Sequence, residues 1–188
     1  MADAPASRPT GWPIAAARFD DLGPLAEMMA ASPLLQRYHV SRDDALASLE
    51  DAYRQGDLIL ACSRSDTASP AGLAWVTRAR ILGGGAYLRL LLVAETRQGS
   101  GVGGRLLRAA ETSARERDNH LYLLVSADNA RARAFYERHG YRHVGDLPEH
   151  VLPGVDEALY HKVLRPHGQR LPTYRASRGR RRTEDGAC

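Results

Sequence analysis

The sequence predicts a single domain of mixed α/β class. Short apolar runs that suit strands alternate along the chain with segments of helical spacing. Clusters of glycine, proline and serine separate these segments. The length of 188 residues and the apolar content of 44% suit one globular domain with its own core.

The individual elements follow from periodicity and from their start and stop signals. Ser41 with Asp44 gives a capping-box-like helix start, and Gly56 ends that helix. An almost wholly apolar strand at 121–126 predicts burial on both of its faces. The predicted order is strand 12–18, helix 20–31, helix 41–56, strands 57–63, 72–80 and 86–93, a helix from about 103, strand 121–126, helix 130–139, and strands 141–144 and 158–164, with a loop at 146–157.

A glycine-rich turn joins the strand at 86–93 to the helix that follows. It reads Gln98-Gly99-Ser100-Gly101-Val102-Gly103-Gly104. The first N–H groups of a helix lack partners and point outward with the positive end of the helix dipole, so an anion such as phosphate is the natural ligand. A flexible surface loop is the alternative, and the flanking sequence has to decide between the two.

Two common phosphate loops are disfavoured here. No Lys-Ser or Lys-Thr follows the glycines, as a nucleotide-hydrolysing P-loop requires. The spacing formally matches a dinucleotide fingerprint, but Asp118 lies at the end of a charged helix, whereas the acid that binds ribose should follow a strand.

A second segment shows which interpretation of the glycine turn applies. This segment reads Asp128-Asn129-Ala130-Arg131-Ala132-Arg133-Ala134-Phe135-Tyr136-Glu137-Arg138-His139-Gly140-Tyr141. It resembles the Asn-x-x-Ala-x-x-Phe-Tyr-Glu-x-x-Gly-Tyr/Phe segment of the GNAT superfamily of acyl-CoA-dependent N-acetyltransferases. The glycine turn resembles the Arg/Gln-x-x-Gly-x-Gly/Ala pyrophosphate loop of the same family. The resemblance covers roughly residues 12–164.

The resemblance implies a GNAT fold. This fold has a mixed central sheet of about six to seven strands, splayed in the middle and flanked by about four helices. The strands at 86–93 and 121–126 are the pair that would part to admit the pantetheine arm of acetyl-CoA. Residues 1–11 would be a disordered N-terminus, 12–164 the acetyltransferase domain, and 165–188 a basic, disordered tail.

The resemblance also implies which residues bind the cofactor. Backbone groups of Leu91 and Val93 would pair with the pantetheine arm as a strand would, and Asn129, which is also placed to cap a helix, would contact the same arm. The implied cofactor-binding residues are Leu91, Leu92, Val93, Gln98, Gly99, Ser100, Gly101, Val102, Gly103, Gly104 and Asn129.

Tyr136 is the implied catalytic residue. At this position the family places a tyrosine beside the sulfur of acetyl-CoA, where a phenol can donate a proton to the departing thiolate. A half-buried aromatic side chain on a helix is the alternative role. No metal is expected to take part.

The general base is the open part of the expected mechanism. An alkylammonium must lose a proton before it attacks. Many relatives carry a carboxylate on one of the two central strands, and this sequence has none there. The remaining candidates, each also readable as an ordinary surface or structural group, are Asp57, Glu95, Glu149, His150 and His161.

The composition of the chain indicates in which cellular compartment the protein is expected. Two cysteines, Cys62 and Cys188, form neither a disulfide framework nor a metal-ligand cluster, and no signal peptide or membrane-spanning run is evident, so a cytoplasmic protein is expected. The net charge of +4 comes from the tail, where seven arginines outnumber two acidic residues. The run Arg178-Gly179-Arg180-Arg181-Arg182 without interleaved aromatics favours a solvated tail over a nucleic-acid site.

The sequence therefore predicts an acetyl-CoA-dependent N-acetyltransferase that acts on an amine, expected to be that of a small molecule. A protein N-terminal or lysine acetyltransferase is the alternative enzyme. A non-catalytic acyl-CoA sensor is the alternative of another class, and retention of Tyr136 argues against it. No membrane partner is expected, and the identity of the amine and a homodimeric state stay open.

Overall fold

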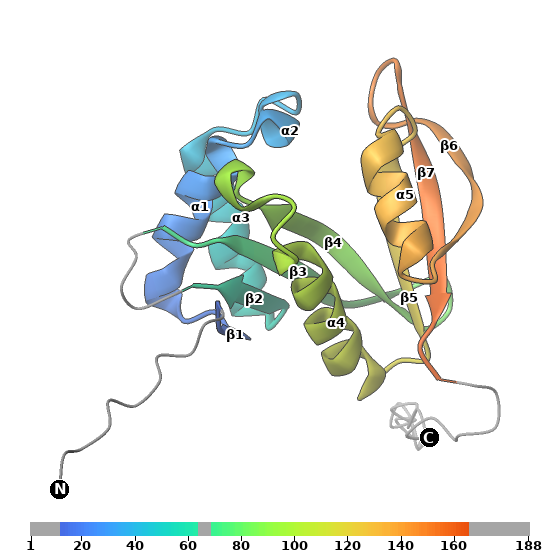
Figure 1. Ribbon diagram of the computed structural model, residues 1–188, viewed down its shortest axis with the longest axis horizontal. Helices are drawn as coiled ribbons and strands as arrows, with labels where there is room; N and C mark the ends of the chain where they lie inside the picture. The colour runs from blue at the N-terminus through green and yellow to red at the C-terminus, as the bar shows by residue number, and fades with distance from the viewer. Residues whose placement is uncertain (1–11, 64–68, 166–188) are drawn as a thin grey trace, which may run out of the picture.

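The described part of the chain forms one seven-stranded sheet with helices on both faces (Figure 1), and five α-helices in all. The computed structural model describes residues 12–63 and 69–165. The predicted N-terminal segment 1–11, the turn at 64–68 and the tail beyond Arg165 lie outside the described residues. The predicted fold class and strand number are confirmed, while the helices of the described residues number five rather than about four.

The observed elements agree with the predicted order. Ser41 caps α3 through a capping box with Asp44, and Gly56, at φ 76°, ends it in the left-handed region. The elements are β1 (Ile14–Ala16), α1 (Leu22–Ala30), α2 (Pro33–Gln36), α3 (Arg42–Gln55), β2 (Leu58–Cys62), β3 (Gly72–Ile81), β4 (Gly85–Val93), α4 (Val102–Arg115), β5 (His120–Ser126), α5 (Ala130–Arg138), β6 (Arg142–Leu152) and β7 (Val155–Val163), with 3₁₀ turns η1 (Phe19–Asp21) and η2 (Glu95–Arg97).

The sheet is split at its centre. Its strand order is β1-β2-β3-β4-β5-β7-β6, and every neighbouring pair is antiparallel except β4 and β5, which are parallel. The pairing of β4 with β5 covers only Ala86–Leu88 against Leu121–Leu123. Beyond these residues the two strands diverge, and the sheet opens between them (Figure 1).

Two cores cover the two faces of the sheet. The strands alternate between them with a period of two: Ile59 and Ala61 pack with α1 and α3, whereas Leu60 and Cys62 pack with α4. The core around α4 continues onto β5 and β7 and includes Tyr136 of α5. The core around α4 therefore joins the two halves of the sheet on one face, whereas the core around α1 and α3 covers only β2, β3 and β4 on the other.

Two sequence predictions are corrected by the structure. In β5, Leu121, Leu123 and Val125 are buried, but Tyr122 and Leu124 are only half-buried, because neither core formed by the described residues includes the face of β5 opposite α4. The predicted loop at 146–157 is wrong as well. These residues extend β6 and β7 into a long hairpin that turns at Gly154, with φ 74°.

The close approach of β3, β4 and α4 gives a stability prediction. A Cβ at Gly72 would lie 2.6 Å from the carbonyl oxygen of Leu92 and 2.9 Å from Cδ1 of Leu106. Because a backbone atom cannot move aside cheaply, Gly72→Ala should destabilise the protein by roughly 1–3 kcal/mol in urea unfolding. Gly145→Ala, on a strand where an added Cβ meets nothing within 4 Å, is the matched control. Equal stability of the two variants would contradict this packing.

Candidate active site

The glycine turn has the geometry of an anion site. Gly99 and Gly101 adopt φ angles of 77° and 82°, which glycine tolerates without strain. The first hydrogen bond of α4 runs from Arg105 N to Gly101 O at 3.2 Å. The N–H groups of residues 102–104 therefore have no backbone partner within the described residues, and they lie at the positive end of the helix dipole.

A pocket of about 510 Å³ begins at this turn and follows the central opening of the sheet. Its walls come from the turn, the end of β4, the exposed side of α5 and the start of α2. The lining residues include Leu91, Leu92, Val93, Gln98, Gly99, Gly101, Gly103, Gly104, Asn129 and Tyr136, which are ten of the twelve predicted site residues.

Ser100 and Val102 are the two predicted residues that do not line the pocket. The Ser100 hydroxyl donates to the carbonyl of Arg97, and the Val102 side chain is buried in the core around α4. The backbone N–H of Ser100 also donates to Arg97 O, at 3.3 Å, so any role of these two residues in binding an anion would fall to the N–H of Val102.

One wall of the pocket is an unpaired strand edge. Ala94 N donates to Ala71 O at 2.9 Å, so Ala94 turns its backbone groups toward β3. Successive residues of a strand turn these groups to opposite edges, so those of Leu91 and Val93 point away from β3 and into the opening. An extended ligand that carries amide groups can pair with this edge as a strand would.

Asn129 and Tyr136 lie on the opposite wall. The Asn129 side chain caps α5 by accepting a hydrogen bond from Ala132 N at 3.0 Å, so its predicted capping role is confirmed. Tyr136 is 8% exposed and lines the pocket, and its hydroxyl has no hydrogen-bond partner among the described residues. Burial raises its pKa, and the nearby Tyr87 raises it further, so the phenol stays protonated at neutral pH.

Three arginines at the pocket went unrecognised in the sequence. Arg97, Arg131 and Arg138 line it near the glycine turn. Arg131 spans the mouth of the pocket and donates to Oε1 of Gln98 at 2.8 Å, while the guanidinium of Arg97 lies 4.8 Å from the Trp12 ring centroid. The available signal was the spacing of Arg131 and Arg138, which places both on one face of α5.

The five residues predicted as candidates for the general base do not lie together in the pocket. Asp57 is held by Trp75 Nε1 at 2.7 Å and by the backbone N–H of Arg78, which gives it a structural role. His161 pairs with His120 at 2.9 Å, and Glu149 and His150 are exposed on β6. Of the five candidates only Glu95 lines the pocket.

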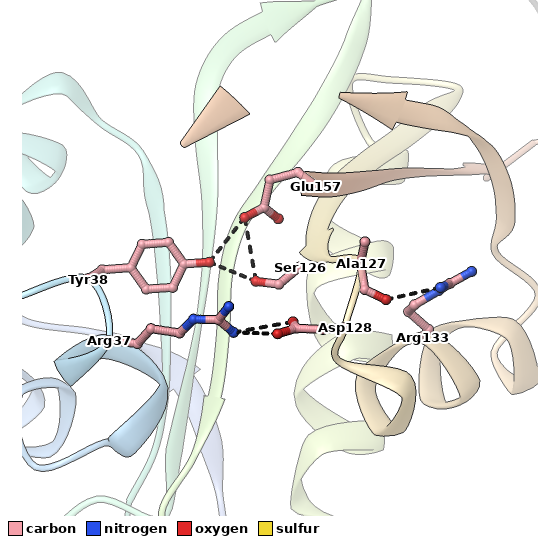
Figure 2. Close-up of polar contacts among 7 residues, drawn as sticks. All are labelled: Arg37, Tyr38, Ser126, Ala127, Asp128, Arg133 and Glu157. Atoms are coloured by element: carbon pink, nitrogen blue, oxygen red, sulfur yellow. Dashed lines mark hydrogen bonds and ion pairs between the residues drawn. The ribbon is translucent and has the colours of Figure 1, made fainter. Parts of the chain in front are cut away.

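A set of polar contacts, also unrecognised in the sequence, spans the opening beyond α2 (Figure 2). Arg37 Nη1 pairs with Asp128 Oδ2 at 2.9 Å. The Tyr38 hydroxyl lies 2.7 Å from Ser126 Oγ and donates to Oε1 of Glu157 at 3.0 Å. These contacts join the segment before α3 to the ends of β5 and β7.

Residues 12–63 and 69–165 contain neither a cluster of metal-ligating side chains nor a membrane-spanning helix. No group of three or more histidine, cysteine, aspartate or glutamate side chains is arranged to hold a metal ion. No helix there has the length and apolar character to span a bilayer.

Comparison with known proteins identifies the class. The profile described as the Acetyltransferase (GNAT) family matches residues 27–141, more than half of the chain. The chain therefore belongs to the GNAT family of acetyltransferases. A search of curated proteins gave no match.

Solved structures share the fold at low sequence identity. A ribosomal-protein-alanine N-acetyltransferase from Brucella melitensis is 23% identical with a TM-score of 0.66, over 80% of this chain and 98% of that one. An acetyltransferase from Salmonella typhimurium, solved with acetyl-CoA, is 19% identical with a TM-score of 0.66, over 83% and 95%. An aminoglycoside 6′-N-acetyltransferase complexed with coenzyme A is 18% identical with a TM-score of 0.64, over 81% and 97%.

Proposed function

We propose that this protein transfers the acetyl group of acetyl-CoA directly to the amine of a small molecule. One observation supports this above all. A single pocket joins the anion-binding turn at Gly101 to the unengaged hydroxyl of Tyr136, along the unpaired edge of β4. This sequence of features matches a ligand with a diphosphate, an amide-containing arm and a reactive end.

In the proposed complex, each part of acetyl-CoA meets a matching part of the pocket. The pyrophosphate lies on the N–H groups of the glycine turn, with Arg97, Arg131 and Arg138 supplying positive charge around it. The pantetheine amides pair with Leu91 and Val93. The thioester then comes to lie beside Tyr136. Structures of similar fold have been solved with coenzyme A or acetyl-CoA, which supports this choice of cofactor.

The proposed chemistry is a direct attack of the amine on the thioester carbonyl. A backbone N–H on the open edge of β4 is placed to stabilise the resulting oxyanion. As the C–S bond breaks, Tyr136 gives its proton to the sulfur. A phenol is a weaker acid than a thiol by about 1.5 pKa units, so complete transfer to a solvated thiolate would cost about 2 kcal/mol. Burial disfavours the free thiolate, but it also raises the pKa of the Tyr136 phenol, so the transfer requires the phenolate to regain a proton as the C–S bond breaks.

The alternative functions differ in the acceptor of the acetyl group, which is either the amine of a small molecule or an amine of a protein. Proteins of similar fold include enzymes for ribosomal-protein and for aminoglycoside amines, so neither protein nor small-molecule acceptors are favoured by fold. Thermal shift with acetyl-CoA, followed by thiol release with a panel of small amines and of peptides, decides between them. Turnover with peptides alone would overturn the small-molecule proposal, and binding without any turnover would favour an acyl-CoA sensor.

Gly101→Asp tests the pyrophosphate site. The substitution adds a negative charge beside the N–H groups of the turn and strains the backbone at φ 82°. Affinity for coenzyme A in calorimetry should fall at least tenfold, about 1.4 kcal/mol. Gly101→Ala shares the strain without the charge and should lose less. Wild-type affinity in a folded Gly101→Asp variant would rule out this site.

Tyr136→Phe tests the proton donor. Because the hydroxyl is needed only when the thiolate departs, kcat should fall at least tenfold while KM for acetyl-CoA changes little. Tyr53→Phe, on a side chain that is 42% exposed, is the matched control. If Tyr136→Phe keeps full turnover with an accepted amine, the proton comes from another group.

Truncation after Arg165 tests the proposed domain boundary. Leu164 is 5% exposed, and its N–H donates to Asn119 O at 2.7 Å, so this cut retains the last described packing contact. The melting temperature, coenzyme A affinity and turnover of a small amine should be unchanged. A large loss of turnover at both low and physiological salt would show that residues 166–188 contribute to the site or to an interface between subunits.

A further inference from the structure

One carboxylate at the central opening has no role in the mechanism so far. Glu157 of β7 is 2% exposed and pairs in register with Ser126 of β5. Its Oε1 accepts hydrogen bonds from the Tyr38 hydroxyl at 3.0 Å and from Ser126 Oγ at 3.4 Å, and Figure 2 shows it directed across the opening toward Tyr38. No hydrogen bond to its Oε2 is found among the described residues.

The basic side chains near Glu157 in the described part of the chain have other partners; the guanidinium of Arg89 lies 4.8 Å from the Trp75 ring centroid. Arg37 is ion-paired with Asp128 at 2.9 Å, and Arg133 donates to the carbonyl of Ala127 at 3.0 Å, so these two arginines are also engaged elsewhere (Figure 2). Within residues 12–63 and 69–165, Glu157 takes part in no ion pair. Burying a carboxylate without a cation is costly, and a cationic ligand would offset that cost.

Glu157 and Tyr136 lie on opposite sides of the sheet. Tyr136 packs into the core around α4, whereas alternation along β5 turns Ser126, and with it Glu157, to the other face. Tyr87 is the middle one of the three β4 residues that pair with β5. Burial raises the pKa of Tyr87, while the charge of Arg89 lowers it and that of Glu157 raises it, so both charged groups lie near this residue.

We propose that Glu157 is the acceptor-side residue that binds the ammonium group of the substrate amine and receives its proton, with Tyr38 and Ser126 holding the carboxylate in place. The inference rests on the proposed acetyl transfer and names its substrate class as a primary alkylammonium. The amine then enters from one face of the sheet, and the thiol forms on the other.

The proton balance follows from this placement. An alkylammonium loses two protons on becoming an amide. One passes to Glu157 and then to water, which frees the nitrogen lone pair to form the C–N bond. The other restores Tyr136 after that residue has protonated the sulfur, so the net products are the amide, the free thiol and one proton.

Binding of an ammonium probe tests the proposal without turnover. Full-length protein in the presence of coenzyme A is titrated by calorimetry with benzylammonium chloride. Glu157→Gln keeps an acceptor for Tyr38 and Ser126 but removes the charge, so affinity should fall at least tenfold. Glu157→Asp keeps the charge and should lose less. The reverse order, or no binding by the wild-type protein at millimolar concentration, overturns the proposal.

Controls separate charge from folding. Glu116→Gln makes the same change on an exposed residue after α4 and should leave benzylammonium affinity within twofold. The melting temperature and coenzyme A affinity of each variant report its folding. If both Glu157 variants fail to fold, Tyr38→Phe serves in their place. It removes one donor to the carboxylate and should weaken benzylammonium binding severalfold; unchanged affinity overturns the proposal.

Turnover then separates this inference from the proposed function. For an alkylamine that the wild-type enzyme accepts, Glu157→Gln should lower kcat/KM at least 100-fold. For a weakly basic amine that is neutral at pH 7, the loss should be at least tenfold smaller, because no proton must be removed before attack. Equal losses overturn the proton-accepting role. If benzylammonium binds through Glu157 but no amine releases thiol, acetyl transfer is wrong and the ammonium site stands.

Discussion

The site depends on one constraint, the parting of β4 from β5 after three paired residues. Backbone N–H and C=O groups left open inside a protein are costly unless something pairs with them. Here they belong to Leu91 and Val93, whose side chains are anchored by packing against the core around α4. The edge is therefore rigid but unpaired, and it is suited to a ligand that completes the ladder.

The two halves of the sheet share the core around α4, and a few polar contacts cross the opening between them. Arg131 reaches Gln98 at one end, while Arg37 and Tyr38 reach Asp128 and Ser126 at the other. The pair of Arg37 and Asp128 is largely exposed, with side chains 41% and 60% accessible, so its contribution to stability is small. The contact between Ser126 and Glu157 is buried and that between Tyr38 and Ser126 is half-buried, so these contacts are better shielded from water.

Sequence reasoning succeeded where the signal was local. The cap of α3 at Ser41, its end at Gly56 and the cap of α5 at Asn129 each depend on a few consecutive residues. The general fold could be predicted because two such segments, at a given separation, resemble a known family. Once the strand is located, the alternation of backbone groups along it also predicts that those of Leu91 point to the free edge.

The acceptor side could not be predicted in the same way. Tyr38 and Glu157 are 119 residues apart, and their contact depends on tertiary structure alone. Glu157 lies in the segment predicted as a loop, because Pro148, Pro153 and Gly154 interrupt the strand pattern of 142–163. The hairpin forms nonetheless, because β7 pairs along all of β5. Long-range pairing outweighed local propensity at this point.

The strand order also bears on the synthesis of the chain. The last described strand, β7, is inserted between β5 and β6 rather than added at the end of the sheet. Until residues 155–163 have left the ribosome, the apolar strand His120–Ser126 has one edge paired over only three residues of β4 and the other edge bare. Such an edge can pair with other chains. A nascent chain that pauses before β7 would thus be the most aggregation-prone species, although it already contains every residue assigned to the acetyl-CoA pocket.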